Sequence, residues 1–246
     1  MNQPKGLFIT GTDTGIGKTL VAAILAVALQ QRLQQGFSYL KPMESGIKNL
    51  EDLSRKSDGA RVQKAAGLPH SLEEIIPFRF REPLAPLLAA RRQQQVVSHK
   101  TLLNTVREHL HQHEFTLMEG AGGLMVPLCP GYLVENLISD LQLPALVVCR
   151  SALGGINHTL LTLSRLRQAK IPVVGIIINH ATGNPGIAEQ NFAELIREFD
   201  SVPILGELPF VPDFSFRREA LLSLADQLDI EQLLKAIKAI RNNKTD

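Results

Sequence analysis

The residue types that can do chemistry are most concentrated in residues 11–19, which read GTDTGIGKT. A Gly-Lys-Thr sequence at the start of a helix favours phosphate binding, because consecutive backbone N–H groups and the helix dipole both point at the anion. Gly15 and Gly17 let the backbone approach the phosphates closely. Lys18 would reach the β- and γ-phosphates of a nucleotide, and the Thr19 hydroxyl would bind Mg²⁺. The stretch therefore predicts a phosphate-binding P-loop.

The loop departs at one position from the strict pattern G-x-x-x-x-G-K-[ST]. Counting back from Gly17 places Thr12 where the first glycine is expected, and Gly11 lies one residue too early. The flanking sequence still supports the motif, because the apolar run 6–10 precedes it and a helix-forming stretch, residues 20–29, follows it. A strand, a glycine-rich turn and a helix in this order are the context that a P-loop requires.

Charged side chains follow two other apolar runs. Lys41 ends the run 37–41, and Pro42 after it stops the strand and holds the ammonium at the edge where the P-loop lies. A solvated lysine is the alternative. Glu119 follows the run 115–118 and precedes Gly-Ala-Gly-Gly, a position expected of a metal-binding acid in a P-loop protein. A plain glycine-rich turn is the alternative there.

Three more places allow two interpretations each. Asp58 follows Ser57 at the start of a predicted helix, where these residues either cap the helix or supply a second Mg²⁺ carboxylate. Gly154 and Gly155 precede another helix and predict either an anion site, suited to a substrate carboxylate, or a tight turn. Asn179 ends an apolar run, and its amide either suits the edge of adenine or belongs to a turn.

Histidines gather near residue 110 and raise the question of a metal site. On a helix His109 and His113 share one face, whereas His111 lies on the other side. No carboxylate partner is evident in the neighbouring sequence, and proximity along the chain does not make a ligand set. The segment is therefore interpreted as the polar end of a helix.

The elements that must position these residues alternate along the chain. Non-alternating apolar runs, such as residues 145–149, indicate strands buried on both faces, as in a parallel sheet covered by helices. The predicted strands are 6–10, 37–41, 115–118, 145–149, 172–178 and 203–206. The predicted helices are 17–34, 57–66, 84–92, 98–112, 133–141, 156–168, 185–199 and 217–240, the last broken near Asp229. This order predicts a single domain, residues 1–246, with a doubly wound, mostly parallel α/β sheet, helices on both faces and ligands at the carboxyl ends of the strands.

The composition is that of an ordinary globular domain. The chain has 246 residues, 44% apolar and 20% charged, with a net charge of +2, which predicts no nucleic-acid partner. Cys129 and Cys149 lack a metal-binding spacing, and Cys149 is expected to be buried. No apolar stretch has the length of a signal peptide or a membrane span, so we expect a cytoplasmic protein without a membrane partner.

Taken in chain order, these motifs resemble those of the dethiobiotin synthetase family. The resemblance runs from the first predicted strand to about residue 211. The motifs are specific in combination, whereas the P-loop alone is not. The matching segments are residues 11–19, Lys41-Pro42 with Ser45-Gly46, Ser57-Asp58, residues 119–123, Leu153-Gly154 with Ile156-Asn157-His158, Asn179, and residues 205–209.

The resemblance implies an ATP-dependent ring closure in biotin biosynthesis on a P-loop NTPase-like fold. The substrates would be 7,8-diaminononanoate, CO₂ or bicarbonate, and MgATP, and the products dethiobiotin, ADP and phosphate. One amine would capture CO₂ as a carbamate, which would become a carbamic–phosphoric anhydride before the second amine closes the ring. The resemblance also implies a homodimer with active sites at the subunit interface.

The resemblance further implies roles for individual residues. Thr19, Asp58 and Glu119 would bind Mg²⁺. Lys18 and Lys41 would be catalytic, with Lys41 kept protonated as a charge stabiliser. The nucleotide would contact Gly15, Ile16, Gly17, Lys18, Thr19, Leu20, Asp58, Glu119, Gly120, Ala121, Gly122, Asn179, His180, Pro209, Phe210 and Val211. The substrate would contact Thr14, Ser45, Gly154, Gly155 and Asn157, with the segment from Leu153 to Asn157 coming from the neighbouring subunit.

Several positions depart from the pattern common in the family. Position 15, often glutamate, is Gly15 here, which removes a carboxylate near the diamine. Position 180, often aspartate, is His180, and position 124, sometimes tryptophan, is Leu124. The chain after Pro212 does not match clearly, and no role is assigned to it. These departures concern substrate affinity and nucleotide selectivity more than the reaction.

Two other functions use related folds. A regulatory switch ATPase of the partitioning or nitrogenase-iron-protein type usually carries an extra lysine early in the P-loop, where this chain has Asp13. An amidating ligase that acts on a large cofactor precursor usually carries a glutaminase-sized extension, which a chain of 246 residues lacks. Both differences favour the synthetase.

Overall fold

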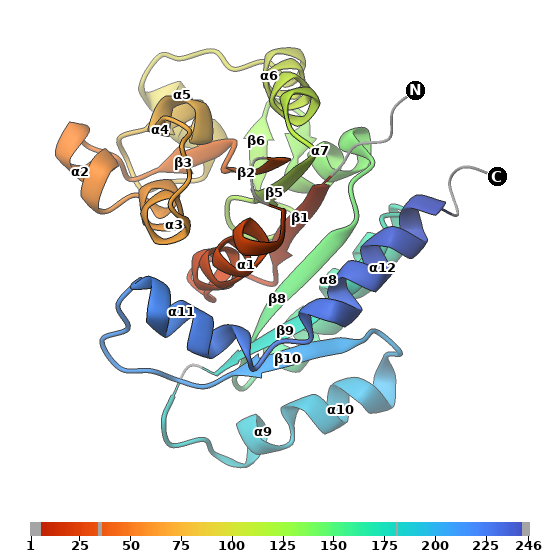
Figure 1. The fold of residues 1–246 in the computed structure, drawn as a ribbon. Coiled ribbons are helices and arrows are strands. Elements are labelled where there is room, and N and C mark those ends of the chain that lie inside the picture. Colours follow the sequence, from red (N-terminus) through yellow and green to blue (C-terminus); the bar gives the residue numbers. More distant parts are fainter. Residues whose placement is uncertain (1–5, 34–35, 181, 243–246) are drawn as a thin grey trace.

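A six-stranded parallel sheet forms the centre of the molecule (Figure 1). The structure is a computed structural model that describes residues 6–33, 36–180 and 182–242. All six predicted strands are confirmed, and their spatial order is β10-β9-β8-β1-β5-β2. The bounds are β1 Gly6–Gly11, β2 Phe37–Leu40, β5 Phe115–Glu119, β8 Ala145–Ser151, β9 Val173–His180 and β10 Ile204–Leu208.

The apolar runs predicted as two-sided strands are buried on both faces. Along β1, Leu7 and Ile9 pack into one hydrophobic core and Phe8 into a second core on the other face. Side chains alternate between the faces of a strand, so an uninterrupted apolar run supplies both cores at once. This confirms the doubly wound α/β interpretation.

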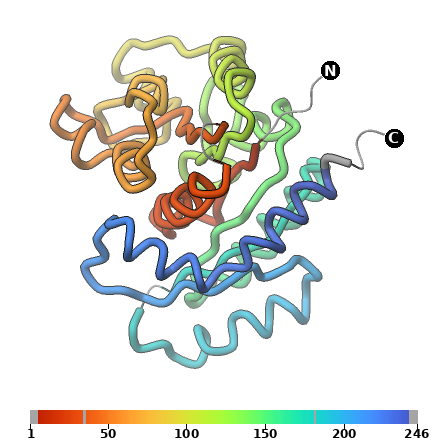
Figure 2. Tube along the Cα trace, viewed as in Figure 1, coloured from red at the N-terminus to blue at the C-terminus, as the bar shows by residue number. Residues whose placement is uncertain are grey.

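Helices cover each face of the sheet (Figure 1). The helices on the face of Ile9 are α1 Lys18–Leu33, α3 Asp58–Ala66, α11 Arg218–Ala225 and α12 Ile230–Asn242. Those on the face of Phe8 are α5 Pro86–Arg92, α6 His99–Gln112, α7 Val134–Leu141, α8 Gly155–Gln168 and α10 Phe192–Phe199. Figure 2 shows α11, near the end of the chain, running beside α1, near its beginning.

Short elements account for most differences from the sequence-based prediction. The stretch 47–56, in which no helix was predicted, contains α2, because the Asn49 side chain accepts the Asp52 N–H at 2.9 Å and caps it. The helix predicted over 185–199 is interrupted at Asn191. The elements not predicted are β3 Met43–Ser45, β4 Phe78–Phe80, β6 Pro127–Cys129, β7 Tyr132–Leu133, α2 Leu50–Arg55 and α4 Leu72–Ile75, and α9 Ile187–Gln190 is a separate helix.

The predicted break near Asp229 is confirmed. The Asp229 N–H donates to the Leu205 carbonyl at 2.7 Å, and its carboxylate accepts the Gln232 N–H at 2.8 Å. These bonds tie the turn between α11 and α12 to β10 and start a new helix.

Parallel pairing brings the predicted functional segments to one edge of the sheet. Ile9 pairs with Glu119, and Arg150 pairs with Asn179, so the ends of four strands lie level with the P-loop. This edge is where ligands bind in open α/β sheets. In the part of the chain that the structure describes, no helix is both long and apolar enough to cross a membrane.

Candidate active site

The P-loop has the backbone that its glycines predict. Gly15 and Gly17 have φ values of +69° and +99°, in the left-handed region that favours glycine. A Cβ atom at Gly17 would lie 2.3 Å from Asn179 Nδ2, so no larger residue fits there. The following helix, α1, begins at Lys18, and its first N–H groups face the loop. The loop is therefore shaped to receive an anion.

Lys18 is folded back onto the loop. Its ammonium donates to the Asp13 carbonyl at 2.6 Å, and the residue is only 7% exposed. Burial lowers the pKa of Lys18 to about 8, although Glu119 opposes part of this effect. A bound polyphosphate would supply the negative charge that favours the protonated lysine.

Lys41, Asp58 and Glu119 meet in one charged cluster. Lys41 Nζ lies 2.5 Å from Asp58 Oδ2 and 2.7 Å from Glu119 Oε1. Burial alone would lower the pKa of Lys41, but the Glu119 and Asp58 carboxylates outweigh it and raise this pKa above its ordinary value. Lys41 is therefore a buried, protonated cation, and the solvated alternative is wrong.

The structure separates the two roles that the sequence left open at the start of α3. The Ser57 hydroxyl accepts the Ala60 N–H at 3.1 Å and is the helix cap. Asp58 is the first helical residue, and its carboxylate turns to Lys41 instead. Burial would raise the pKa of Asp58, but Lys41 reverses the effect and the pKa is lowered. Asp58 is therefore an ionised carboxylate available for chemistry.

The oxygen donors around this cluster fit a magnesium ion. The Thr19 hydroxyl donates to Glu119 Oε1 at 2.8 Å, which brings the hydroxyl and both carboxylates around Lys41 Nζ. Mg²⁺ prefers a few protein oxygens and completes its octahedron with water and substrate phosphates. Thr19, Asp58 and Glu119 form such a partial set beside the phosphate-binding loop.

Two residues of this site were missed by sequence reasoning. Glu44 is buried, and its two carboxylate oxygens accept the Asp58 N–H at 2.6 Å and the Gly59 N–H at 3.2 Å. Burial raises the pKa of Glu44 to about 7, against the effect of Lys41. The Tyr39 hydroxyl donates to Glu119 Oε2 at 2.7 Å. Their nearness in sequence to Lys41, at a strand end, was the available signal.

A cavity of about 250 Å³ lies on the side of the P-loop away from the Lys41 cluster. It is lined by Gly15, Leu20, Arg150, Asn179, His180, Pro209, Phe210, Val211 and Phe214. Most of the residues expected around the nucleotide base therefore share one cavity. The Asn179 amide nitrogen donates to the Ile16 carbonyl at 2.9 Å, so its oxygen is left to accept a donor.

His180 is held by side chains from both neighbouring strands. Its Nδ1 lies 2.7 Å from Ser151 Oγ, at the end of β8, and its Nε2 lies 3.0 Å from Glu207 Oε2, on β10. Both ring nitrogens are used within the protein, so His180 contributes the ring itself to the cavity wall. Sequence reasoning missed Ser151 and Glu207, which the pairing of β8, β9 and β10 places beside His180.

None of the residues expected to contact the substrate lines this cavity. The Ser45 hydroxyl donates to the Leu84 carbonyl at 2.7 Å. Gly154 caps α8 with φ +85°, and Asn157 one turn later is exposed. Leu153 beside them is 93% exposed. The start of α8 therefore faces outward from the chain.

The histidines near residue 110 form a cluster with a third, unforeseen member. The His70 ring lies 4.7 Å from that of His113, and the His109 ring lies 4.6 Å from that of His113. His111 is exposed, as its helical position predicts. The described residues contain no group of three or more His, Cys, Asp or Glu side chains arranged to hold a metal.

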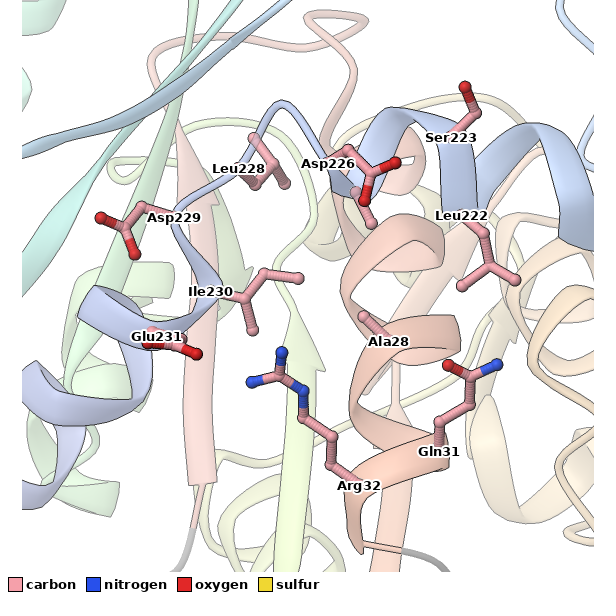
Figure 3. A pocket seen from close by; sticks show the side chains of 11 residues that line it. Ala28, Gln31, Arg32, Leu222, Ser223, Asp226, Leu228, Asp229, Ile230 and Glu231 are labelled. Atoms are coloured by element: carbon pink, nitrogen blue, oxygen red, sulfur yellow. The ribbon is translucent and has the colours of Figure 1, made fainter.

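A second cavity, of about 480 Å³, lies at the far end of α1 (Figure 3). Gln31 and Arg32 on α1 line it together with Asp226 and Asp229 of the turn between α11 and α12, and with Glu231 in the first turn of α12. The P-loop leads into the first residue of α1, whereas Gln31 and Arg32 lie in the last turn of this helix. A helix of this length separates its ends by roughly 20 Å, so this cavity is distinct from the candidate active site.

Comparison with known proteins gives a consistent family. Residues 5–218 match a family model described as an AAA domain. The ATP-dependent dethiobiotin synthetase BioD of Bacillus licheniformis is 41% identical over 86% of this chain and 88% of its own length. The synthetase of the same name from Thermodesulfovibrio yellowstonii is 38% identical over 89% of this chain and 99% of its own. That from Bacillus subtilis is 35% identical over 95% and 99%.

Solved structures with low sequence identity share the fold. A MinC:MinD cell division complex of Aquifex aeolicus aligns with a TM-score of 0.57 at 15% identity, over 96% of this chain and 95% of that one. A ParA family ATPase of Chlorobium tepidum aligns with a TM-score of 0.54 at 15% identity, over 95% and 97%. These likenesses show a P-loop NTPase-like fold, and the relatives at 35 to 41% identity show that the chain belongs to the ATP-dependent dethiobiotin synthetase family of ligases.

Proposed function

We propose that this enzyme catalyses the ATP- and Mg²⁺-dependent carboxylation and ring closure of 7,8-diaminononanoate with CO₂ to dethiobiotin, releasing ADP and phosphate. The observation that carries the proposal is the meeting of Lys41, Asp58 and Glu119 beside the Thr19 hydroxyl of the P-loop. Cations, carboxylates and a hydroxyl at one strand edge are what a phosphoryl transfer to a weak anionic nucleophile requires.

The charge problem of this reaction explains the cations. A carbamate formed on the substrate must attack the γ-phosphate, and both are anions. Two unit charges about 4 Å apart repel by about 4 kcal/mol at an effective dielectric constant near 20. Lys41, held protonated by its carboxylate partners, and Lys18 supply positive charge from the protein. Mg²⁺, when bound through Thr19, Asp58 and Glu119, would neutralise further phosphate charge.

Each chemical step then has a protein group to assist it. The carbamate oxygen attacks the γ-phosphorus and expels ADP, giving a carbamic–phosphoric anhydride. The second amine attacks the carbamoyl carbon and expels phosphate, which closes the cyclic urea. Lys41 acts as a charge stabiliser, since an ammonium with a raised pKa has no free electron pair to form a Schiff base. Holding both amines near the same carbon makes the closure intramolecular.

We assign the nucleotide base to the cavity of about 250 Å³ lined by Asn179, His180 and the segment from Pro209 to Val211. The free Asn179 oxygen would accept the exocyclic amine of adenine. Residues 15–20 and 120–122 would surround the phosphates, and Thr14 and Ser45 would contact the diamine. ATP is then the proposed co-substrate, as in the synthetases that the chain resembles.

We also propose a homodimer in which Gly154, Gly155 and Asn157 complete the neighbour's substrate site. The exposure of Leu153 and Asn157 supports this, because the start of α8 is left open in one chain. Light scattering should then give twice the chain mass of 27.1 kDa, and a monomer would contradict the arrangement. A cytoplasmic location follows from the need for ATP, and cell fractionation tests it.

The proposed reaction is tested by incubating the purified protein with MgATP, bicarbonate and 7,8-diaminononanoate, and by measuring dethiobiotin by mass spectrometry. Formation that requires all three is expected. ATP hydrolysis without dethiobiotin, and unaffected by the diamine, would contradict the proposal and favour a regulatory ATPase.

A further inference from the structure

Arg150 occupies a position in the nucleotide region that the motifs did not single out. It lies near the end of β8, directly beside Asn179 on β9. Its side chain lines the cavity of about 250 Å³ together with Gly15 and Leu20 of the P-loop region. Among the residues that line this cavity it is the one with a permanent positive charge.

The guanidinium of Arg150 is incompletely satisfied. A terminal nitrogen donates to the Gly15 carbonyl of the P-loop. The Nε–H group is buried and has no hydrogen-bond partner. No carboxylate of the described residues forms an ion pair with Arg150. A buried N–H group on a charged side chain is energetically costly to leave unpaired. The unpaired Nε–H of Arg150 therefore needs a functional explanation.

Two other arginines show how this fold treats a structural guanidinium. Arg165 donates to both carboxylate oxygens of buried Glu135, one of these bonds being 2.7 Å long. Arg167 donates to both oxygens of buried Asp200, one of these bonds being 2.6 Å long. Arg165 uses two of its nitrogens and Arg167 uses one, and each has a buried carboxylate as its partner. Arg150, in contrast, donates to a neutral carbonyl and lines a cavity.

We propose that Arg150 binds the phosphate groups of the nucleotide from the side of the base cavity. The proposal rests on the proposed use of ATP and adds a residue to it. A planar guanidinium matches phosphate oxygens with two donors, and it stays charged at every physiological pH. Because Arg150 also holds the Gly15 carbonyl, the same side chain links the bound phosphates to the conformation of the P-loop.

The test compares Arg150→Gln with Arg150→Lys in the full chain. Glutamine keeps an N–H donor for the Gly15 carbonyl and loses the charge, whereas lysine keeps the charge. Arg91→Gln, which removes an exposed arginine on α5, is the matched control. Isothermal titration calorimetry would measure the affinities of each variant for MgADP, AMP and adenosine at low and high salt.

We expect Arg150→Gln to weaken MgADP binding about tenfold or more and to flatten its salt dependence, as loss of a charge-assisted hydrogen bond does. Arg150→Lys should retain most of the affinity, and adenosine binding should be unchanged in every variant. Equal MgADP affinity in wild type and Arg150→Gln would overturn the proposal. So would a loss in Arg150→Lys as large as that in Arg150→Gln, because the charge that lysine keeps would then contribute nothing to MgADP binding.

This outcome is separable from failure of the proposed function. If the wild-type protein binds no nucleotide, the use of ATP is itself wrong. If the wild type binds MgADP and forms dethiobiotin while Arg150→Gln binds equally well, the role of Arg150 alone is refuted.

Discussion

The two ends of strands β2 and β5 hold opposite kinds of polar group. At their carboxyl ends, Lys41 and Glu119 form a charged cluster with Asp58. At their amino ends, Ser38 and Thr116 share a neutral hydrogen bond of 2.8 Å, and Ser38 Oγ lies 3.1 Å from Nε2 of His109 on α6. Both groups are buried, and the same two strands carry both.

The difference shows how burial is used for two purposes. Burial, together with the nearby His113 and His70, lowers the pKa of His109 to about 4, so this end stays neutral. At the other end, burial is overcome because carboxylates surround Lys41 and raise its pKa. Neutral hydrogen-bonded groups can be buried at little cost in free energy. Burying paired charges has a large desolvation penalty, which is expected where the charges are needed for function.

Removing the cation from the charged end should have the largest effect. We expect Lys41→Ala to lower kcat about 100- to 1,000-fold, the usual loss when a preorganised charge contact is removed. It should also lower stability by about 3–5 kcal/mol, since Glu119 stays buried without its cation and Asp58 stays partly buried. Steady-state kinetics and urea unfolding check both.

A matched control for this variant is Arg55→Ala, which breaks an exposed pair with Glu51. That variant should change kcat and stability little, because exposed ion pairs contribute little. Near-normal kcat in Lys41→Ala would remove Lys41 from the mechanism and end the contrast between the two strand ends.

Neutralising a carboxylate at the same end should act on the metal. Glu119→Gln keeps one accepting oxygen, which can serve Lys41 and Thr19 as Oε1 does, and removes one negative charge. We expect the Mg²⁺ concentration for half-maximal rate to rise about 100-fold, the upper end of the range for groups that support a bound metal. Kinetics at varied free Mg²⁺ measure this, with Glu73→Gln on the surface as control. An unchanged Mg²⁺ titration would exclude Glu119 as a ligand.

Acidification should protonate His109, at the neutral amino ends of β2 and β5, and so remove its contribution to stability. His109 has an ordinary pKa of 6.5 when unfolded and about 4 when folded, so below pH 6.5 the unfolded state binds more protons. The contribution of His109 to stability is therefore complete above pH 6.5 and falls as pH decreases toward 4, by about 2 kcal/mol between pH 7 and 5. His113, whose pKa burial also lowers, adds to the same trend, while Glu74 opposes it. Glu44, whose pKa burial raises to about 7, acts in the opposite direction over this range, so the prediction concerns the difference between the wild type and a His109 variant.

The measurement is urea unfolding at pH 7, 6 and 5 for the wild type and His109→Leu. The variant should lose less stability on acidification, because leucine takes up no proton. Equal pH dependence in both proteins would show that His109 is not held neutral by the fold.

The smallest expected effect comes from the hydroxyl at the neutral end. Ser38→Ala removes the bonds to Thr116 and His109 and should lower the free energy of unfolding by about 1 kcal/mol. Its kcat should match the wild type. A change in kcat without a change in stability would contradict the division between the two strand ends.

The strands and long helices were predictable because their signals are local. The run from Ala145 to Cys149 is apolar on both faces, and the sheet buries it on both faces. The break near Asp229 was predictable for the same reason. The strand β3, in contrast, consists of three residues and pairs with β4, about 35 positions later in the chain. Such short strands have no periodicity of their own.

Site residues followed the same rule. Lys18, Thr19, Lys41, Asp58 and Glu119 stand in motifs, so their types and positions singled them out as candidates. Glu44 was missed because its role is to accept the backbone N–H groups of residues 58 and 59.

From residue types and order alone, the chain specifies a P-loop, a parallel sheet, the strand edge that carries the site, and the family. The protonated state of Lys41, the cap at Ser57, the clamp on His180 and the unpaired guanidinium of Arg150 depend on distances between distant segments. The physical reason is that pKa values and hydrogen bonds respond to groups within a few ångströms in space, whatever their separation along the chain.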